Sequence, residues 1–150
     1  MCIRDRAEID YNNLPTIRGY RSDFIQLFQN FISNSIKYSR PEAKPKIKIE
    51  SQMTKDFFTI KISDNGRGIS KEAMNSILKE FERGDSTDND GHGIGLATCQ
   101  RIIKGYDGKM DISSEVGVGT CITIFLKNRT EKIITQSDAV QAALGAALKN

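Results

Sequence analysis

The first third of the chain carries hydrophobic residues at three- and four-residue spacing, which is the period of one face of an α-helix. This stripe comprises Phe24, Leu27, Phe28, Phe31 and Ile32. It predicts a long helix over about residues 22–38, with one face buried in a core.

Farther along the chain, the hydrophobic pattern changes between two periods. Alternation of apolar and polar residues predicts strands at residues 46–51, 57–63, 109–114 and 120–127, and a shorter extended segment near residues 14–17. Helical spacing returns at residues 71–81, with Ser70 as the N-cap, and at residues 94–105. This order of elements predicts a two-layer α/β sandwich, in which helices cover one face of a mixed β-sheet.

Composition and charge agree with one folded domain. The chain has 150 residues, 38% of them hydrophobic, and a net charge of +3, which fits a single soluble domain with a modest core. Lys44, Lys46 and Lys48 alternate with Ile47 and Ile49, as on the outer face of a strand. Because no aromatic residue interleaves with these lysines, the sequence disfavours a nucleic-acid surface.

The three cysteines, Cys2, Cys99 and Cys121, are odd in number and lack CxxC spacing. Cys99 and Cys121 fall at core-type positions of a predicted helix and strand, which indicates free thiols in a reducing compartment. No apolar run approaches the ~18 residues of a membrane span, and no signal peptide is visible. We therefore expect a cytoplasmic segment without direct membrane contact, and a membrane anchor of the parent protein would lie upstream.

The long helix also carries a polar stripe, within the segment NFISNSIKY. Asn30, Asn34, Lys37 and Tyr38 stand at i, i+4, i+7 and i+8, so they project together from about two turns of one helix. An asparagine carbonyl suits Mg²⁺, which relies on water and phosphates for its other ligands, and a lysine beside it would meet a phosphate. For such a stripe taken alone, a solvated helix face is the simpler interpretation.

A second segment, DNGRGI, follows the strand expected at residues 57–63. The carboxylate of Asp64 would accept a hydrogen bond from an exocyclic amine, and Gly66 and Gly68 would let the backbone approach a flat ring. These features describe an adenine pocket. Guanine would turn a carbonyl oxygen toward the same carboxylate, so the pocket should reject GTP. Taken alone, Asp-Asn-Gly is more simply an ordinary turn at the end of a strand.

Glycine dominates the third and fourth segments, GHGIGL and GVGT. Gly91, Gly93 and Gly95 run into the helix expected at residues 94–105, and a helix N-terminus is a natural seat for phosphate. Residues 82–90, ERGDSTDND, contain no apolar residue and are expected to form a mobile lid. The sequence has neither a Walker-type P-loop nor a GxGxxG within a βαβ unit, which excludes those two nucleotide-binding folds.

In this order, the four segments resemble those of the catalytic and ATP-binding domain of sensor histidine kinases. That family belongs to a group of ATPases that includes DNA gyrase, the mismatch-repair ATPase and the large heat-shock chaperone. The resemblance extends over about residues 14–126. It implies a Bergerat-type ATP-binding fold with a mobile ATP lid, in which Mg²⁺ and ATP lie between the helices and the lid.

The resemblance implies roles for the helix residues and for the carboxylate. Asn34 would bind Mg²⁺, and Asn30 would lie beside it near the phosphates. Lys37 and Tyr38 would contact phosphate and nucleoside. Asp64 would bind the adenine amino group.

It also implies roles for the residues of the loops. Adenine would be supported by Gly66, Gly68 and Ile69, and Thr120 would lie under the base. The residues that would close over the triphosphate are Gly91, Gly93, Gly95 and Leu96. Phe81 and Arg83 would belong to the F box beside the lid, where Arg83 would contact a phosphate. The expected catalytic residues are therefore Asn30, Lys37 and Arg83.

One position separates the kinases from their hydrolytic relatives. In the gyrase and chaperone branches, a glutamate one helical turn before the metal-binding asparagine activates water, and here that position is Asn30. An amide cannot act as a general base. We therefore expect poor ATP hydrolysis, with the γ-phosphate held for an external nucleophile.

The nucleophile itself is missing. The only histidine is His92, within the glycine loop, and it is a poor phosphoacceptor candidate. The resemblance implies a separate partner, a dimerisation hairpin of the parent kinase that carries the acceptor histidine, and indirectly a response regulator. The chain alone should not autophosphorylate. Two alternatives remain, a serine kinase of the anti-sigma-factor kind in the same ATPase group, and a non-catalytic module that binds ATP or another protein.

The two ends of the chain fall outside this pattern. Residues 1–6, MCIRDR, share nothing with the domain and are excluded as an assembly or cloning artefact. Residues 7–128 are expected to form the ATP-binding domain. Residues 129–150 form a tail, whose stretch 139–148 has helix propensity and would either pack on the domain or remain free.

Overall fold

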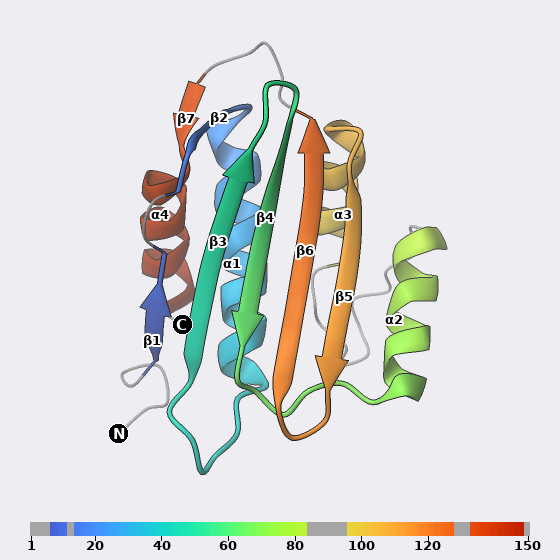
Figure 1. Ribbon diagram of the computed structural model, residues 1–150. Coiled ribbons are helices and arrows are strands. Elements are labelled where there is room, and N and C mark those ends of the chain that lie inside the picture. The colour runs from blue at the N-terminus through green and yellow to red at the C-terminus, as the bar shows by residue number, and fades with distance from the viewer. Residues whose placement is uncertain (1–6, 12–13, 84–95, 128–132, 149–150) are drawn as a thin grey trace.

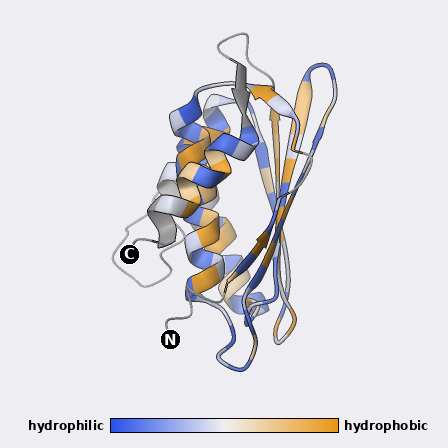
Figure 2. Cartoon of the chain, turned by 90° about the vertical axis from the view of Figure 1, so that its left-hand side faces the viewer, coloured by the Kyte–Doolittle hydropathy of each residue, from blue (hydrophilic) through white to orange (hydrophobic). Residues whose placement is uncertain are grey.

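The protein folds as a β-sheet with helices packed against one of its faces, in two layers (Figures 1 and 2). The computed structural model describes residues 7–11, 14–83, 96–127 and 133–148. The helices are α1 (Arg21–Lys37), α2 (Lys71–Arg83), α3 (Leu96–Gly105) and α4 (Gln136–Leu148). The predicted α/β sandwich is confirmed, and no described helix has the length and apolar character needed to cross a membrane.

Five strands form the main sheet, in the order β1-β3-β4-β6-β5. These strands are β1 (Glu8–Asp10), β3 (Lys46–Met53), β4 (Phe57–Asp64), β5 (Lys109–Glu115) and β6 (Gly119–Lys127). β1 pairs with β3 in parallel and the other neighbours pair antiparallel, so the sheet is mixed. A separate antiparallel pair joins β2 (Thr16–Arg18) to β7 (Ile133–Thr135).

The alternation read from the sequence fixes the faces of the sheet. In β3, Ile47 and Ile49 are buried while Lys46 and Lys48 are exposed, as predicted for a strand with one solvated face. In the register of β4 and β6, Ile60 lies opposite Ile124 and both are buried. Because side chains on a strand alternate between faces, the isoleucines of neighbouring strands gather under the helices.

Helix α1 supplies the other half of the core. All five residues of its predicted apolar stripe are essentially inaccessible to solvent, and burial of each such side chain stabilises the fold by roughly 1.5–3 kcal/mol. The Phe24 ring contacts Phe58 of β4 and Tyr106, which follows α3, with centroid distances of 5.8 and 5.3 Å. One helix therefore contacts the centre of the sheet and the neighbouring helix.

Helix α2 begins as the sequence predicts. The Ser70 hydroxyl oxygen accepts a hydrogen bond from the N–H of Ala73 at 3.2 Å, which satisfies one of the free donors of the first helical turn. The helix lies beside β5 at the edge of the sheet (Figure 1). This cap fixes where the loop after β4 turns into a helix.

The C-terminal segment packs on the domain. Of the two arrangements expected for the tail, packed or free, the packed one is observed. In α4, Ala139, Val140 and Ala143 are fully buried and the helix lies alongside α1. Gln136 at its start donates through Nε2 to the carbonyl oxygen of Pro15 at 2.7 Å and to the Ser51 hydroxyl at 3.0 Å. Small side chains thus let two helices approach closely, and a buried amide holds the first turn in place.

Three local features differ from the prediction. The strands β1 and β7 have three residues each, which is too short to produce a periodic signal. Cys121, expected at a core-type position, lies opposite Ser63 in the register and receives a 3.5 Å hydrogen bond from the Ser63 hydroxyl. Because Ile122 and Ile124 occupy the helix-facing positions of β6, Cys121 lies on the opposite, open face.

We expect Ala143→Leu to lower the free energy of unfolding by about 1–3 kcal/mol, because a larger side chain has no room between α4 and α1. Urea denaturation followed by circular dichroism measures this change. The matched control is Gly145→Ala in the same helix, where an added Cβ would meet no atom within 4 Å. The control should leave stability unchanged or raise it by up to about 1 kcal/mol. Equal effects of the two variants would contradict the packing of α4.

Candidate functional site

A cavity of about 340 Å³ lies between α1, α2, the end of β4 and β6, a size typical of small-molecule sites. Its apolar walls come from Phe31, Ala73, Ile77 and Ile122. Its polar lining includes Asn34, Ser35, Tyr38, Asp64, Arg67, Ser70 and Thr120. Four of the predicted site residues with polar side chains, Asn34, Tyr38, Asp64 and Thr120, are therefore brought together in one cavity.

The Asp64 carboxylate is held in a fixed orientation by three donors from different parts of the chain. Its Oδ1 accepts the N–H of Gly66 at 2.9 Å and the N–H of Thr120 at 3.3 Å. Its Oδ2 accepts the Ser35 hydroxyl at 3.0 Å. A carboxylate oxygen can accept more than one hydrogen bond, so Oδ2 retains capacity for a donor on a ligand. Ser35 was not predicted as a site residue.

The glycines near Asp64 are needed by contacts within the protein. Gly68 has φ of +77°, and a Cβ there would collide with the carbonyl oxygen of Glu115. A Cβ on Gly66 would lie 2.8 Å from the carbonyl oxygen of Tyr38. Of these two glycines, only Gly68 lines the cavity. Glycine is required at these two positions because the loop packs its backbone closely against the end of α1 and against β5. This requirement adds to the expected approach to a ligand.

Thr120 is positioned by a small hydroxyl network. The Thr120 and Ser114 hydroxyl oxygens lie 2.9 Å apart. Ser114 also accepts the N–H of Ile69 at 2.8 Å and donates to the carbonyl oxygen of Gly119 at 2.9 Å. Ser114 was not predicted as a site residue. Its signal was present, because Met110, Ile112 and Ser114 share one face of β5 and only the last is polar.

The two asparagines of the polar stripe diverge. Asn34 lines the cavity, and its buried Nδ2 has no hydrogen-bond partner among the described residues. Asn30 instead donates through Nδ2 to the sulfur of Cys99 on α3 at 3.7 Å and is not part of the cavity lining. Burial raises the pKa of the Cys99 thiol to about 12, although the hydrogen bond from Asn30 acts in the opposite direction.

Two cations lie near the ring of Tyr38 at the C-terminal end of α1. The Lys37 Nζ is 5.3 Å and the Arg67 guanidinium carbon 5.4 Å from the ring centroid, within the range of cation–π attraction. The backbone of Arg67 is fixed from both sides, because its N–H donates to the carbonyl oxygen of Tyr38 at 3.0 Å and its carbonyl accepts the N–H of Gly117 at 2.8 Å.

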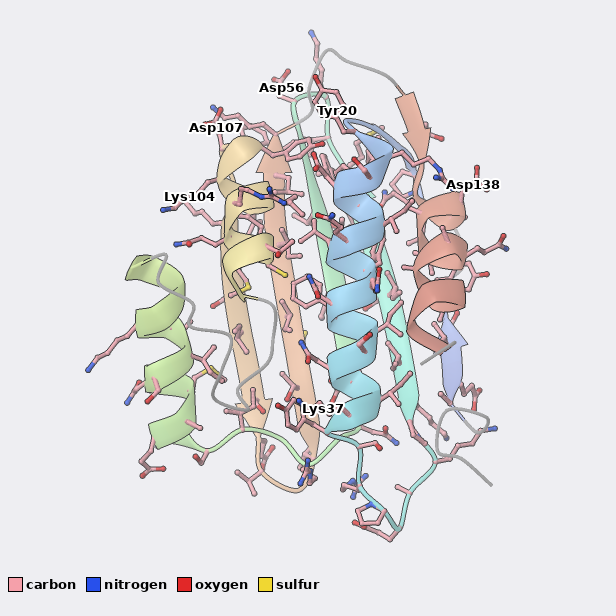
Figure 3. The ribbon with its side chains drawn as sticks, turned by 180° about the vertical axis from the view of Figure 1, so that it is seen from behind. Tyr20, Lys37, Asp56, Lys104, Asp107 and Asp138 are labelled. Carbon is pink, nitrogen blue, oxygen red and sulfur yellow. The ribbon has the colours of Figure 1, made fainter. Side chains whose placement is uncertain are left out.

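Arg67 lines the cavity, whereas the exposed Lys37 does not. Figure 3 shows Lys37 at the opposite end of α1 from Tyr20. Arg67 was missed because it stands between two glycines in DNGRGI, where the sequence gives no sign of the ring it would contact.

Several predicted residues cannot be placed in this site. The side chains of Phe81, Arg83 and Leu96, and residues Gly91, Gly93 and Gly95, lie outside the described part of the structure. The lid expected at residues 82–90 begins later than predicted, because α2 extends through Arg83, and residues 84–90 lie outside the described part of the structure. His92 also lies outside it, as do residues 94–95, the predicted start of the helix observed as α3. Their roles stay predictions.

A family model described as "Histidine kinase-, DNA gyrase B-, and HSP90-like ATPase" matches residues 19–130. The chain is 35% identical over 115 residues to the phytochrome-like protein Cph1 of Synechocystis sp., which is 76% of this chain and 15% of that protein. It is also 35% identical over 112 residues to the adaptive-response sensory kinase SasA of Prochlorococcus marinus, which is 73% of this chain and 30% of that protein. The chain thus spans a minor part of these relatives.

Solved structures share the fold. The mycobacterial sensor histidine kinase MprB superposes with a TM-score of 0.65 at 23% identity, over 84% of this chain and 86% of that one. The catalytic domain of the histidine kinase ThkA gives a TM-score of 0.63 at 21% identity, over 84% of this chain and 82% of that one. At this identity the likeness concerns the fold alone.

The raised pKa of Cys99 predicts a loss of stability at alkaline pH. Between the ordinary thiol value of 9.0 and about 12, the unfolded chain loses this proton while the folded chain retains it, so the free energy of unfolding falls as pH rises. Below that window the contribution is fully present. Urea denaturation near pH 8 and near pH 10 should show a drop on the order of 1 kcal/mol that is absent from Cys99→Ala. Cys121→Ala is the control and should retain the drop, and identical pH dependence in wild type and Cys99→Ala would contradict this prediction.

Proposed function

The chain belongs to the histidine kinase-, DNA gyrase B- and HSP90-like ATPase family, and we propose that it is the Mg²⁺–ATP-binding catalytic domain of a sensor histidine kinase. In this proposal it transfers the γ-phosphoryl group to a histidine on a separate dimerisation hairpin, as one step of two-component signalling. Its solved structural neighbours include the catalytic domain of a histidine kinase. Because the chain spans only 15% to 30% of the relatives named above, the acceptor histidine would come from a different part of such a protein.

The oriented carboxylate of Asp64 is the observation that carries this proposal. Oδ1 accepts two backbone N–H groups, Oδ2 accepts one hydroxyl, and Asp64 lines the cavity. The exocyclic amine of adenine is a donor and would complete the set. Guanine would place a carbonyl oxygen against the same acceptor, which favours ATP over GTP.

The phosphate end would be organised by α1. Asn34 lines the cavity with a buried amide that lacks a partner among the described residues, and a ligand that satisfied it would remove an energetic cost. Its amide oxygen is a suitable ligand for Mg²⁺, whose other ligands would be water and phosphate oxygens. Lys37 and Arg83 are the proposed phosphate contacts. Bound Mg²⁺ would neutralise charge that develops on the triphosphate.

The chain's own residues favour transfer to an external nucleophile. Asn30 offers an amide, which cannot take a proton from water, at the position where the hydrolytic relatives carry a glutamate. In the proposed transfer, an imidazole nitrogen of the acceptor attacks the γ-phosphorus, the bond from that phosphorus to the bridging oxygen breaks, and ADP leaves. Positioning and charge neutralisation carry most of such a reaction.

Two other functions were compatible with the sequence, and one measurement separates them. A serine kinase of the same ATPase group would leave an acid-stable phosphoester on its partner, whereas phosphohistidine is lost in acid. A non-catalytic module would transfer nothing. Incubation with Mg²⁺–ATP and a purified histidine-bearing hairpin, followed by acid treatment, therefore distinguishes all three.

Asp64→Asn should weaken Mg²⁺–ATP binding by roughly ten- to a hundredfold, because it removes a charge-assisted hydrogen bond and offers a donor to the adenine amine. Isothermal titration calorimetry, with GTP as a competitor, measures both affinity and selectivity. Asp111→Asn is the matched control, since Asp111 is an exposed carboxylate on β5. A folded wild type that binds no nucleotide, or equal affinities for ATP and GTP, would contradict the adenine pocket.

Arg67 should act by supporting the Tyr38 wall of the cavity. Loss of one cation–π contact is worth about 0.5–1 kcal/mol at an exposed site, so Arg67→Met should weaken ATP and adenosine by the same roughly two- to fivefold. Arg67→Lys should retain most of the affinity. Competition titrations with both ligands test this prediction, and a loss confined to ATP would mean that Arg67 contacts phosphate.

A further inference from the structure

The face of the sheet that the helices leave uncovered carries an uneven distribution of side chains. Figure 1 views the molecule from this open face, with α1, α3 and α4 behind the strands. At the β5–β6 turn the exposed apolar residues are Val116 and Val118. At the other end of β4 and β6 they are Phe57 and Phe125.

The two phenylalanines form one small apolar surface. Phe57 is 50% and Phe125 is 43% exposed. Phe57 lies opposite Lys127 in the β4–β6 register, and Phe125 lies opposite Thr59, so the rings are diagonal neighbours on adjacent antiparallel strands and within reach of one another. Two large aromatic side chains therefore share the open face at one end of β4 and β6, where none of the described helices covers them.

Three lysines surround these rings. Lys109 of β5 lies directly opposite Phe125 of β6, and Lys127 lies two residues after Phe125 on β6. Lys61 lies on β4, two residues after Thr59, which is the residue opposite Phe125. None of the three forms an ion pair with a described residue. We call Phe57, Lys61, Lys109, Phe125 and Lys127 the Phe125 patch.

Two other described lysines form ion pairs. Lys48 lies 3.5 Å from Glu50, and Lys44 lies 3.8 Å from Glu8. Lys61, Lys109 and Lys127, beside the aromatic rings, have no such carboxylate partner among the described residues, an arrangement that would attract an anionic group to an apolar contact.

We propose that the Phe125 patch binds a separate protein through a surface on which carboxylates surround an apolar side chain. Aromatic residues are enriched among the side chains that dominate binding energy, and a charged rim raises the association rate and selects the partner. Phe125 would be the apolar anchor. Lys61, Lys109 and Lys127 would face the carboxylates of the partner.

The remaining charges on the open face favour a protein over other anionic partners. Asp10, Glu50 and Asp111 are exposed there, and a nucleic acid or an anionic membrane lying across the sheet would bring its phosphates against these carboxylates. A second copy of this chain, bound symmetrically through the Phe125 patch, would place the patch lysines against one another. A protein surface can match a mosaic of both signs, because its own charges vary over a few ångströms.

The proposal is independent of nucleotide chemistry. The Phe125 patch and the cavity lie on opposite faces of the sheet, since Thr120 and Ile122 of β6 line the cavity and Phe125 has the opposite parity. Variants of the patch should therefore leave ATP affinity unchanged.

The test is nuclear magnetic resonance titration of the isotope-labelled full chain. The probe is a synthetic amphipathic helix with one leucine stripe flanked by glutamates, and its control has every glutamate replaced by glutamine. We expect the acidic peptide to shift amides at the Phe125 end of β4, β5 and β6, with an affinity that falls as salt is added. Phe125→Ser and Lys109→Glu should each weaken binding by about tenfold or more. Lys46→Glu, at the other end of the same face, and Val118→Ser, in the β5–β6 turn, are the matched controls.

Each other outcome overturns the proposal. These outcomes are absence of binding by the acidic peptide, equal binding of the glutamine peptide, unchanged affinity in the Phe125 and Lys109 variants, and stronger binding of an oligothymidylate or of phosphatidylserine vesicles. Dimerisation of the chain through this face, measured by sedimentation, would also overturn it. Thermal melting confirms that each variant is folded.

Discussion

The site depends on one carboxylate that ties together three elements of the fold. Asp64 ends β4, and its two oxygens accept hydrogen bonds from Ser35 on α1, from the backbone of Gly66 in the following loop, and from the backbone of Thr120 on β6. This carboxylate joins three elements of the fold because its oxygens satisfy donors from each of them, and the same residue lines the cavity. The glycines around it allow the close backbone approach that this arrangement requires.

Helix α1 meets two requirements through its two faces. Its apolar stripe packs on the sheet, so the position and rotation of the helix are set by the core. Two residues of its polar stripe, Asn34 and Tyr38, are thereby held in the wall of the cavity. Preorganisation of this kind matters for phosphoryl transfer, in which positioning supplies most of the catalysis. The same helix therefore contributes both to the core and to the wall of the cavity.

Most of the architecture could be predicted from the sequence, because hydrophobic periodicity is strong in α1, β3, β4 and β6. Three-residue strands carry no such signal, and β1 and β7 were missed for that reason. Asp64, Asn34, Tyr38 and Thr120 were predicted to share a site, and the cavity contains all four. Arg67 and Ser35 could not be predicted, since their roles depend on a contact with a neighbouring ring or across 29 residues of chain. Ser114 was missed although it is the one polar residue on its face of β5. The contact between Asn30 and Cys99 spans 69 residues and was equally beyond local patterns.

The order of strands in the sheet has a consequence for the path of folding. β4 pairs on one side with β3, which is its neighbour in the chain, and on the other with β6, which follows only after α2, the glycine loop and α3. Pairings between segments so distant in sequence form slowly, because the intervening chain must lose its freedom first. During synthesis, a chain that has emerged only as far as α3 lacks Thr120 and the wall contributed by β6. Nucleotide cannot template the early stages of folding, so acquisition of ligand affinity would mark the moment at which β6 inserts between β4 and β5.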